Sequence, residues 1–365
     1  MANLLDYIAW RGDIDMARDE FNEVDGAVFA RLSYVPFDGF VSERTDYIQK
    51  LGDVACALCG ARDIEAKNDS GNDEELIRSI KNSRRFYEIG ICAYVNKSDT
   101  QEQTQFAAVT FKISDELYYI AFRGTDSTLI GWKEDFNMSF TFPVPAQSSA
   151  IRYYEKIAER FKNARFILGG HSKGGNLAVC AAAFCRPALQ ERVVSVYNYD
   201  GPGFDGNVIN MDGYRRICNR THTFLPQSSI VGMLLEHEEK YTVIHSIQNG
   251  IWQHNIYSWE LVRNRFVYLD SVTNSSRMID KTLKEWIAGM STEHRERLVD
   301  VVYNIMKDTN IQTIREMNEH RFVSAKAILK STKNLDPPTR KVVTQSLGIL
   351  FRSAGKSISE VFRKK

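Results

Sequence analysis

The spacing of hydrophobic and polar residues changes along this chain of 365 residues and divides it into three parts. Residues 1–90 place apolar residues at helical spacing, which predicts a helical N-terminal lead-in packed on a core. Residues 91–274 switch to short β-rich runs separated by helical segments. Residues 275–365 return to helical spacing in a highly charged background, and this predicts a helical C-terminal cap or appendage.

The middle part predicts an α/β fold with a mostly parallel sheet, because strand-like runs alternate there with helical segments. We expect the helical connections to cross over on both faces of the sheet, and functional residues to gather at the carboxyl ends of its strands. One connection differs, since Ser114-Asp115-Glu116 predicts a hairpin turn. The predicted strands are residues 91–95, 106–113, 117–122, 166–168, 193–199, 220–225 and 241–245.

A short glycine-rich sequence, Gly170-His171-Ser172-Lys173-Gly174, stands between a predicted strand and a predicted helix. A serine on so sharp a turn needs nearly bare positions two residues before and after it, because side chains there would collide with the neighbouring strand or helix. Gly170 and Gly174 meet this need. Ser172 is therefore our candidate nucleophile, and the main-chain N–H of Lys173, at the positive end of the helix, is a candidate oxyanion donor.

Composition excludes several classes of function. The chain is 43% hydrophobic and 25% charged, as in ordinary globular proteins, and its net charge of +1 gives no reason to expect nucleic acid as a partner. No apolar run is long enough to span a membrane. The N-terminus carries acidic residues where a signal peptide needs a basic flank and a long apolar core, so we expect a cytoplasmic protein.

The six cysteines do not suggest a disulfide scaffold in a chain of this length. Cys56 and Cys59 form a lone C-x-x-C pair, with no second pair or nearby histidine to complete a zinc site. We interpret them as two buried thiols on one helical segment. We accordingly expect no metal and no cofactor.

Two motifs in the middle part carry a family resemblance. A predicted strand ends in Phe122-Arg123-Gly124-Thr125, Trp132 and Asp135 follow, and the serine turn comes later at a fitting distance. Together they resemble the lipase class 3 family, the fungal triacylglycerol lipases and their bacterial relatives, and in particular a bacterial branch with the G-H-S-K-G turn. The resemblance covers about residues 90–260. It implies an α/β-hydrolase fold and a second oxyanion donor at Thr125.

The base is expected late in the chain, because the hydrolase order is serine, acid, histidine. His254 matches the late histidine of the family, which is followed closely by an aromatic residue, and His245 is the reserve. His171 belongs to the serine turn and is interpreted as a feature of that turn.

The acid departs from the resemblance. Class 3 lipases take an aspartate from the loop that corresponds to residues 225–231, which here reads LPQSSIV and contains no carboxylate. Either the serine and histidine act as a dyad, or the acid has moved. Asp200, at the end of the preceding strand, is the main candidate, as in pancreatic-type lipases, although a turn former would also suit its position. Asp205 and Glu236 are weaker candidates.

The resemblance also implies a lid over residues 127–147, with Leu129, Trp132 and Phe136 binding substrate. The same apolar residues suit a buried helix and strand equally well. For the C-terminal helices, a basic amphipathic face would additionally suit peripheral contact with a membrane.

The sequence therefore predicts a serine hydrolase that cleaves carboxylic esters, of acyl lipids or small acyl esters, through an acyl-enzyme. Two alternatives stay open. One is an amidase or acyltransferase that uses the same serine. The other is a catalytically inactive hydrolase-like binding or scaffold protein, which the missing family acid favours and the intact Ser172 and His254 oppose. The sequence does not set the oligomeric state.

Overall fold

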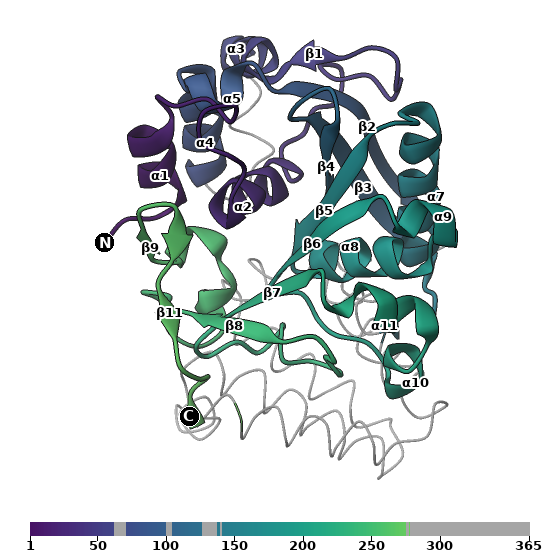
Figure 1. Cartoon of the computed structure of the whole chain (residues 1–365). Helices are drawn as coiled ribbons and strands as arrows, with labels where there is room; N and C mark the ends of the chain where they lie inside the picture. Colours follow the sequence, from purple (N-terminus) through teal and green to yellow (C-terminus); the bar gives the residue numbers. More distant parts are fainter. Residues whose placement is uncertain (62–70, 100–103, 126–136, 139–140, 275–276, 278–365) are drawn as a thin grey trace, which may run out of the picture.

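The computed structural model of the chain describes residues 1–61, 71–99, 104–125, 137–138, 141–274 and 277. In these residues a nine-stranded sheet has the order β1-β2-β3-β4-β5-β6-β7-β8-β11 (Figure 1), and β9 (Leu261–Val262) pairs with β10 (Arg265–Phe266) in a small second sheet. The strands of the main sheet are β1 (Gln49–Lys50), β2 (Gly90–Asp99), β3 (Thr104–Lys112), β4 (Leu117–Phe122), β5 (Arg165–His171), β6 (Val193–Tyr199), β7 (Thr221–Pro226), β8 (Tyr241–Ile244) and β11 (Tyr268–Leu269).

Strands β4 to β8 are parallel, and antiparallel pairs flank them on both sides. The predicted hairpin is confirmed, because β3 and β4 pair antiparallel across Ser114-Asp115-Glu116. Each strand predicted from the sequence is present, with its ends displaced by at most a few residues. The fold is that of an α/β-hydrolase, with the serine turn between β5 and the helix that follows it.

Two hydrophobic cores lie on the two faces of the sheet. Along β4, Tyr118, Ile120 and Phe122 belong to one core, while Tyr119 and Ala121 belong to the other, as the alternation of a strand requires. The first core is covered by the helices that connect the parallel strands, and the second by the N-terminal helices (Figure 1). The connecting helices are α7 (Pro145–Arg160), α8 (Lys173–Phe184), α9 (Pro187–Gln190), α10 (Gly206–Ile209) and α11 (Asp212–Cys218).

The prediction that crossovers lie on both faces is wrong for the described connections. Residues of α7, α8 and α11 all contribute to the same core. Strands β4, β5, β6 and β7 follow one another across the sheet in chain order, so every right-handed crossover steps in the same direction and its helix lies on the same face. The opposite face is left for the N-terminal residues.

The N-terminal part supplies helices α1 (Leu4–Arg11), α2 (Glu23–Leu32), α3 (Leu51–Gly60), α4 (Gly71–Lys81) and α5 (Arg84–Tyr87). Asp25 and Arg85 form a fully buried ion pair between α2 and α5, at 2.5 Å. Tyr7 donates to Asp25 from α1 at 2.9 Å. Because a buried charge is tolerated only when paired and hydrogen-bonded, these contacts fix three N-terminal helices to one another.

Helix α3 corrects the interpretation of the C-x-x-C pair. Cys56 is exposed and Cys59 is half-buried, and both thiols are free. The inward stripe of the helix is already occupied at helical spacing, so the two cysteines lie off it. The buried residues of α3 are Leu51, Gly52, Val54, Ala55 and Leu58.

Some predicted segments lie outside the described residues. These include nearly all of the proposed C-terminal appendage, 275–365, and most of the lid-like segment 127–147, with Leu129, Trp132 and Phe136. The end of that segment is described, and its last residues open α7 at Pro145. In the part of the chain that the structure describes, no helix is long and apolar enough to cross a membrane.

Candidate active site

Ser172 lies at the turn between β5 and α8, where the parallel strands end. Its backbone angles, φ 59° and ψ −136°, belong to a region that a residue with a side chain rarely adopts. Its N–H donates to the carbonyl of Tyr199 on the neighbouring strand β6 at 2.9 Å. The strained turn is thus tied to the sheet, and the serine is presented at the N-terminus of a 12-residue helix.

The steric prediction for the two glycines is confirmed. A Cβ added to Gly170 would lie 2.3 Å from the main-chain carbon of Gly174, and one added to Gly174 would lie 2.1 Å from the carbonyl oxygen of Phe122. Both neighbours are main-chain atoms, one at the start of α8 and one in β4, and they cannot move aside as a flexible side chain would. Bare positions therefore let β5, α8 and β4 meet around Ser172.

Asp200 and His254 form a close pair. Asp200 is fully buried directly after β6 and has a positive φ of 53°, and its Oδ2 lies 2.6 Å from His254 Nδ1. His254 ends the short 3₁₀ helix η1 (Gly250–His254), with 25% of its side chain exposed. A carboxylate facing Nδ1 keeps the proton on that nitrogen, so Nε2 is left to accept a proton.

The link between Ser172 and His254 runs through His171. The rings of His171 and His254 are 4.5 Å apart, and His171 Nε2 donates to the His254 carbonyl at 2.7 Å. In the described part of the chain, no hydrogen bond joins Ser172 Oγ to His254. Such a bond is often long before substrate binds, so the arrangement brings the candidate nucleophile and the candidate base to one edge of the sheet without closing their contact.

His171 is uncharged in this setting. Burial holds the pKa of His171 well below its usual value, and the nearby His254 and Arg31 lower it further. A neutral imidazole has one donor and one acceptor nitrogen, and the His254 carbonyl requires the donor at Nε2.

The loop after β4 passes directly against the serine. A Cβ added to Gly124 would lie 3.0 Å from Ser172 Cβ and 2.6 Å from the His171 carbonyl oxygen. Thr125 is the next residue, and Lys173 follows Ser172 as the first residue of α8. The Lys173 side chain is buried, with Nζ 3.4 Å from the carbonyl oxygen of Gln105. Both candidate oxyanion residues therefore belong to segments that meet at the serine.

Asn176 was not identified from the sequence. From α8 its side chain donates to the carbonyls of Pro202, at 3.2 Å, and Gly203, at 2.8 Å, in the loop that follows Asp200. Its Oδ1 accepts from Gln147 Nε2 at 2.8 Å. The buried amide of Asn176 thus joins α8 to the loop that follows Asp200. The signal in the sequence is one amide residue in the otherwise small and apolar run from Gly174 to Ala183.

The other residues considered as base or acid have different partners. His245 Nδ1 lies 2.6 Å from Glu260 Oε2. Asp205 caps α10 by accepting from the Asn207 N–H at 2.9 Å. Glu236 is exposed, and its main chain pairs with Phe204. It is His254, and not the reserve histidine, that pairs with Asp200.

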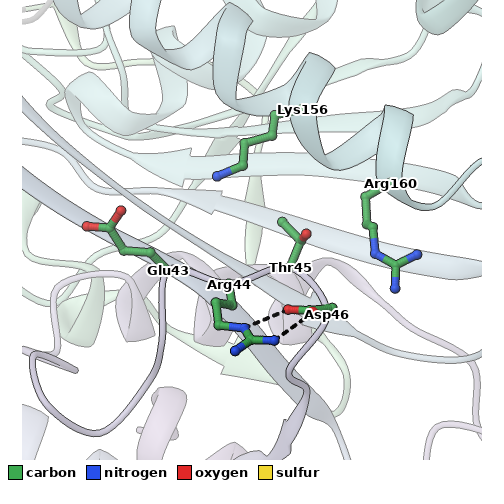
Figure 2. Close-up of a pocket in the computed structure, with 6 residues that line it drawn as sticks. All are labelled: Glu43, Arg44, Thr45, Asp46, Lys156 and Arg160. Carbon is green, nitrogen blue, oxygen red and sulfur yellow. Dashed lines mark hydrogen bonds and ion pairs between the residues drawn. The ribbon is translucent and has the colours of Figure 1, made fainter.

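A surface depression of about 450 Å³ lies elsewhere, between loop 43–46 and the last turns of α7 (Figure 2). Its walls are polar and charged, and Arg44 and Asp46 neutralise each other across 2.8 Å. It shares no residue with the strand ends that carry Ser172 and Asp200. The residues that line it are Glu43, Arg44, Thr45, Asp46, Lys156 and Arg160.

Comparison with known proteins places this site in a family. Residues 80–304, more than half of the chain, match the Mbeg1-like family. No match was found among curated proteins.

Solved lipase structures are similar to this chain at low identity. The lipase–propeptide complex of Rhizomucor miehei has 13% identity and a TM-score of 0.38, over 60% of this chain and 67% of that chain. Lipase II from Rhizopus niveus has 13% identity and a TM-score of 0.38, over 64% and 83%. The lipase from Rhizopus microsporus var. chinensis has 14% identity and a TM-score of 0.35, over 61% and 73%. These identities and TM-scores are too low to assign a chemical role, so the chemistry of the site is inferred from its own geometry.

Proposed function

Since this chain belongs to the Mbeg1-like family, and its site combines a strained serine with a histidine–aspartate pair, we propose that it is a serine hydrolase that cleaves carboxylic esters. The substrates we propose are acyl lipids or small acyl esters. The observation that carries the proposal is the 2.6 Å contact between His254 Nδ1 and the buried Asp200 Oδ2. This contact orients a base at the edge of the sheet where Ser172 is presented.

In the proposed reaction, Ser172 Oγ attacks the acyl carbonyl and His254 Nε2 takes its proton. Asp200 stabilises the imidazolium that forms. The main-chain N–H groups of Lys173 and Thr125 hold the oxyanion of the tetrahedral intermediate. His254 then gives the proton to the leaving alcohol. In the second half of the reaction, water attacks the acyl-enzyme while His254 takes its proton, the bond between the acyl carbon and Ser172 Oγ breaks, and His254 returns the proton to Oγ.

An inactive scaffold fits the site less well. A buried carboxylate is costly unless it is paired, and Asp200 adopts a positive φ that is unfavourable for a residue with a side chain. The burial of the Asp200 carboxylate and its unfavourable backbone angle are explained if Asp200 aligns His254 as a base. They bring no benefit to a surface that only binds a partner.

The test is covalent labelling with a fluorophosphonate probe, followed by peptide mapping, together with turnover of short and long nitrophenyl esters. We expect labelling at Ser172 in the wild-type chain and none in Ser172→Ala or His254→Ala. Ser149→Ala, which removes a hydroxyl bonded within α7, is the matched control and is expected to label normally. A folded wild-type chain that neither labels nor turns over an ester would overturn the proposal.

A further inference from the structure

The hydroxyl of Tyr34 lies at a junction of the candidate site. Its single proton faces two acceptors of His171, the carbonyl oxygen at 3.1 Å and Nδ1 at 3.3 Å, and is shared between them. A Cβ added to Gly124 would lie 2.2 Å from the same hydroxyl, so it also touches the loop that leads to Thr125. Tyr34 follows α2 in the N-terminal part and lies before residues 80–304, the region that matches the family.

From Tyr34 the contacts continue to the proposed base. Because His171 is neutral and donates from Nε2 to the His254 carbonyl, its Nδ1 is an acceptor that faces the Tyr34 hydroxyl. Because Nδ1 accepts a share of the hydroxyl proton, Tyr34 favours the tautomer with the ring proton on Nε2 and one orientation of the His171 ring. That orientation holds the main chain of His254 at 2.7 Å.

A second set of contacts holds the loop that carries His254 at Tyr257, three residues after the histidine. The Arg31 guanidinium lies 4.5 Å above the Tyr34 ring and forms a two-point ion pair with Asp73, in which Nε and Oδ1 are 2.6 Å apart. Asp73 Oδ1 also accepts from the hydroxyl of Tyr257 at 2.7 Å.

The two sets of contacts form a closed circuit. It runs from Tyr34 to His171 and His254, along the chain to Tyr257, and back to Tyr34 through Asp73 and Arg31. The hydroxyl of Tyr257 and the carboxylate of Asp73 are buried, so these contacts compete little with water. The loop that carries His254 is thus held at His254 itself, through His171 and Tyr34, and three residues later at Tyr257, by Asp73.

We infer that Tyr34 is a positioning residue for His254, acting through His171, and that the N-terminal segment is part of the catalytic unit. The inference rests on the proposed function, since it assigns His254 the role of base. Tyr34 does not touch the reacting atoms in this arrangement. Its effect is to hold the base where Ser172 Oγ can reach it when substrate binds.

The variant that tests this is Tyr34→Phe, which keeps the ring under Arg31 and removes only the hydroxyl. We expect kcat for a nitrophenyl ester to fall about tenfold with KM changed less than about twofold, because base placement contributes to the transition state and not to substrate binding. Tyr154→Phe is the matched control. Tyr154 also donates to a main-chain carbonyl, that of Leu189 at 2.7 Å, but it packs on Phe166, at the opposite end of β5 from the serine turn. We expect it to leave kcat unchanged.

Variants at His171 provide a second kinetic readout. His171→Gln retains an N–H that can donate to the His254 carbonyl, whereas His171→Leu retains none. We expect the glutamine variant to keep about tenfold more kcat than the leucine variant. Equal rates in two folded variants would contradict a role through this hydrogen bond.

Histidine ¹⁵N spectra separate this inference from the proposed function. In the wild-type chain we expect His171 to carry its proton on Nε2, and in Tyr34→Phe we expect the ring signals of both His171 and His254 to shift. If the wild-type chain hydrolyses esters, unchanged kcat in Tyr34→Phe overturns the inference. If the wild-type chain hydrolyses none, the proposed function fails, and the His254 signals alone decide: a shift supports the positioning and no shift overturns it.

Discussion

Ser229 donates its hydroxyl proton to Asp200 Oδ1 over 2.5 Å, from the loop after β7 in which the resemblance to class 3 lipases places the acid itself. The Gly232 N–H in turn donates to Ser229 Oγ at 3.0 Å. This loop therefore contacts the candidate acid, although it contains no carboxylate of its own. With Oδ1 bound by Ser229, the carboxylate of Asp200 is fixed in the rotation that turns Oδ2 to His254.

Removal of this hydroxyl is expected to weaken catalysis without preventing it. In Ser229→Ala the carboxylate loses one donor and one constraint on its rotation, so we expect kcat to fall about tenfold, the equivalent of one hydrogen bond to a charged group. Ser228→Ala is the control, because the Ser228 hydroxyl pairs with Thr273 at 3.0 Å and not with Asp200. Ester turnover by the two variants at saturating substrate is the measurement. Equal rates would show that Ser229 does not orient the acid.

Substitution of Asp200 itself is expected to cost far more. Asp200→Asn presents an amide that cannot stabilise an imidazolium at His254, and we expect kcat to fall about 10³- to 10⁴-fold with the chain still folded. Asp205→Asn tests the rival acid that the sequence left open. Since Asp205 caps α10, its variant is expected to keep wild-type turnover. A reversed result, with activity lost only at Asp205, would exclude Asp200 as the acid.

The parts of this structure that sequence could predict are local. The serine turn follows from five consecutive residues and the apolar runs beside them, because a strand-to-helix reversal leaves no room for side chains at Gly170 and Gly174. The strands are predicted for the same reason, since each is a short β-rich apolar run that can be recognised by itself. The faces occupied by α7, α8 and α11 were predicted wrongly, because they depend on the order of strands across the sheet and no single segment encodes that order.

The residues that sequence missed act over long separations. Tyr34 is 137 positions from His171, and Ser229 is 29 positions from Asp200. Neither lies in a motif, and each gains its partner only when the sheet assembles. Asp200 could be named as a candidate because strand ends gather at one edge, but its choice over Asp205 needed the position of His254.

The steric argument at the elbow gives a stability prediction. In Gly174→Ala the new methyl group would lie 2.1 Å from the Phe122 carbonyl oxygen, and main-chain atoms on both sides prevent relief. We expect a loss of about 3 kcal/mol or more in the free energy of unfolding, or no soluble protein. Gly60→Ala is the control, since a Cβ at this position in α3 meets nothing within 4 Å. Urea unfolding of both variants is the measurement. Equal midpoint urea concentrations would contradict the close packing of β4 on the serine turn.

Glu239 gives the fold a defined acid sensitivity. It is buried, and burial alone would raise its pKa. The hydrogen bond and the charge of His237 act with hydrogen bonds from Tyr214 at 2.6 Å and Thr223 at 2.7 Å. Together they outweigh burial, and the pKa of Glu239 falls from 4.5 to about 2. A carboxyl whose pKa is lower in the folded chain stabilises the fold above its unfolded pKa, and this stabilisation is lost as the pH falls through the folded value.

The contribution is therefore complete above about pH 5 and lost between about pH 4.5 and 2, and it amounts to about 3 kcal/mol. In Glu239→Gln the side chain no longer titrates, so the difference in unfolding free energy between wild type and variant is expected to shrink by that amount across this window. Urea unfolding at several pH values measures it. Glu238→Gln, at an exposed neighbouring position, is expected to show no such trend. A difference at Glu239 that stays constant with pH would mean that hydrogen-bond geometry, and not its charge, accounts for what Glu239 contributes.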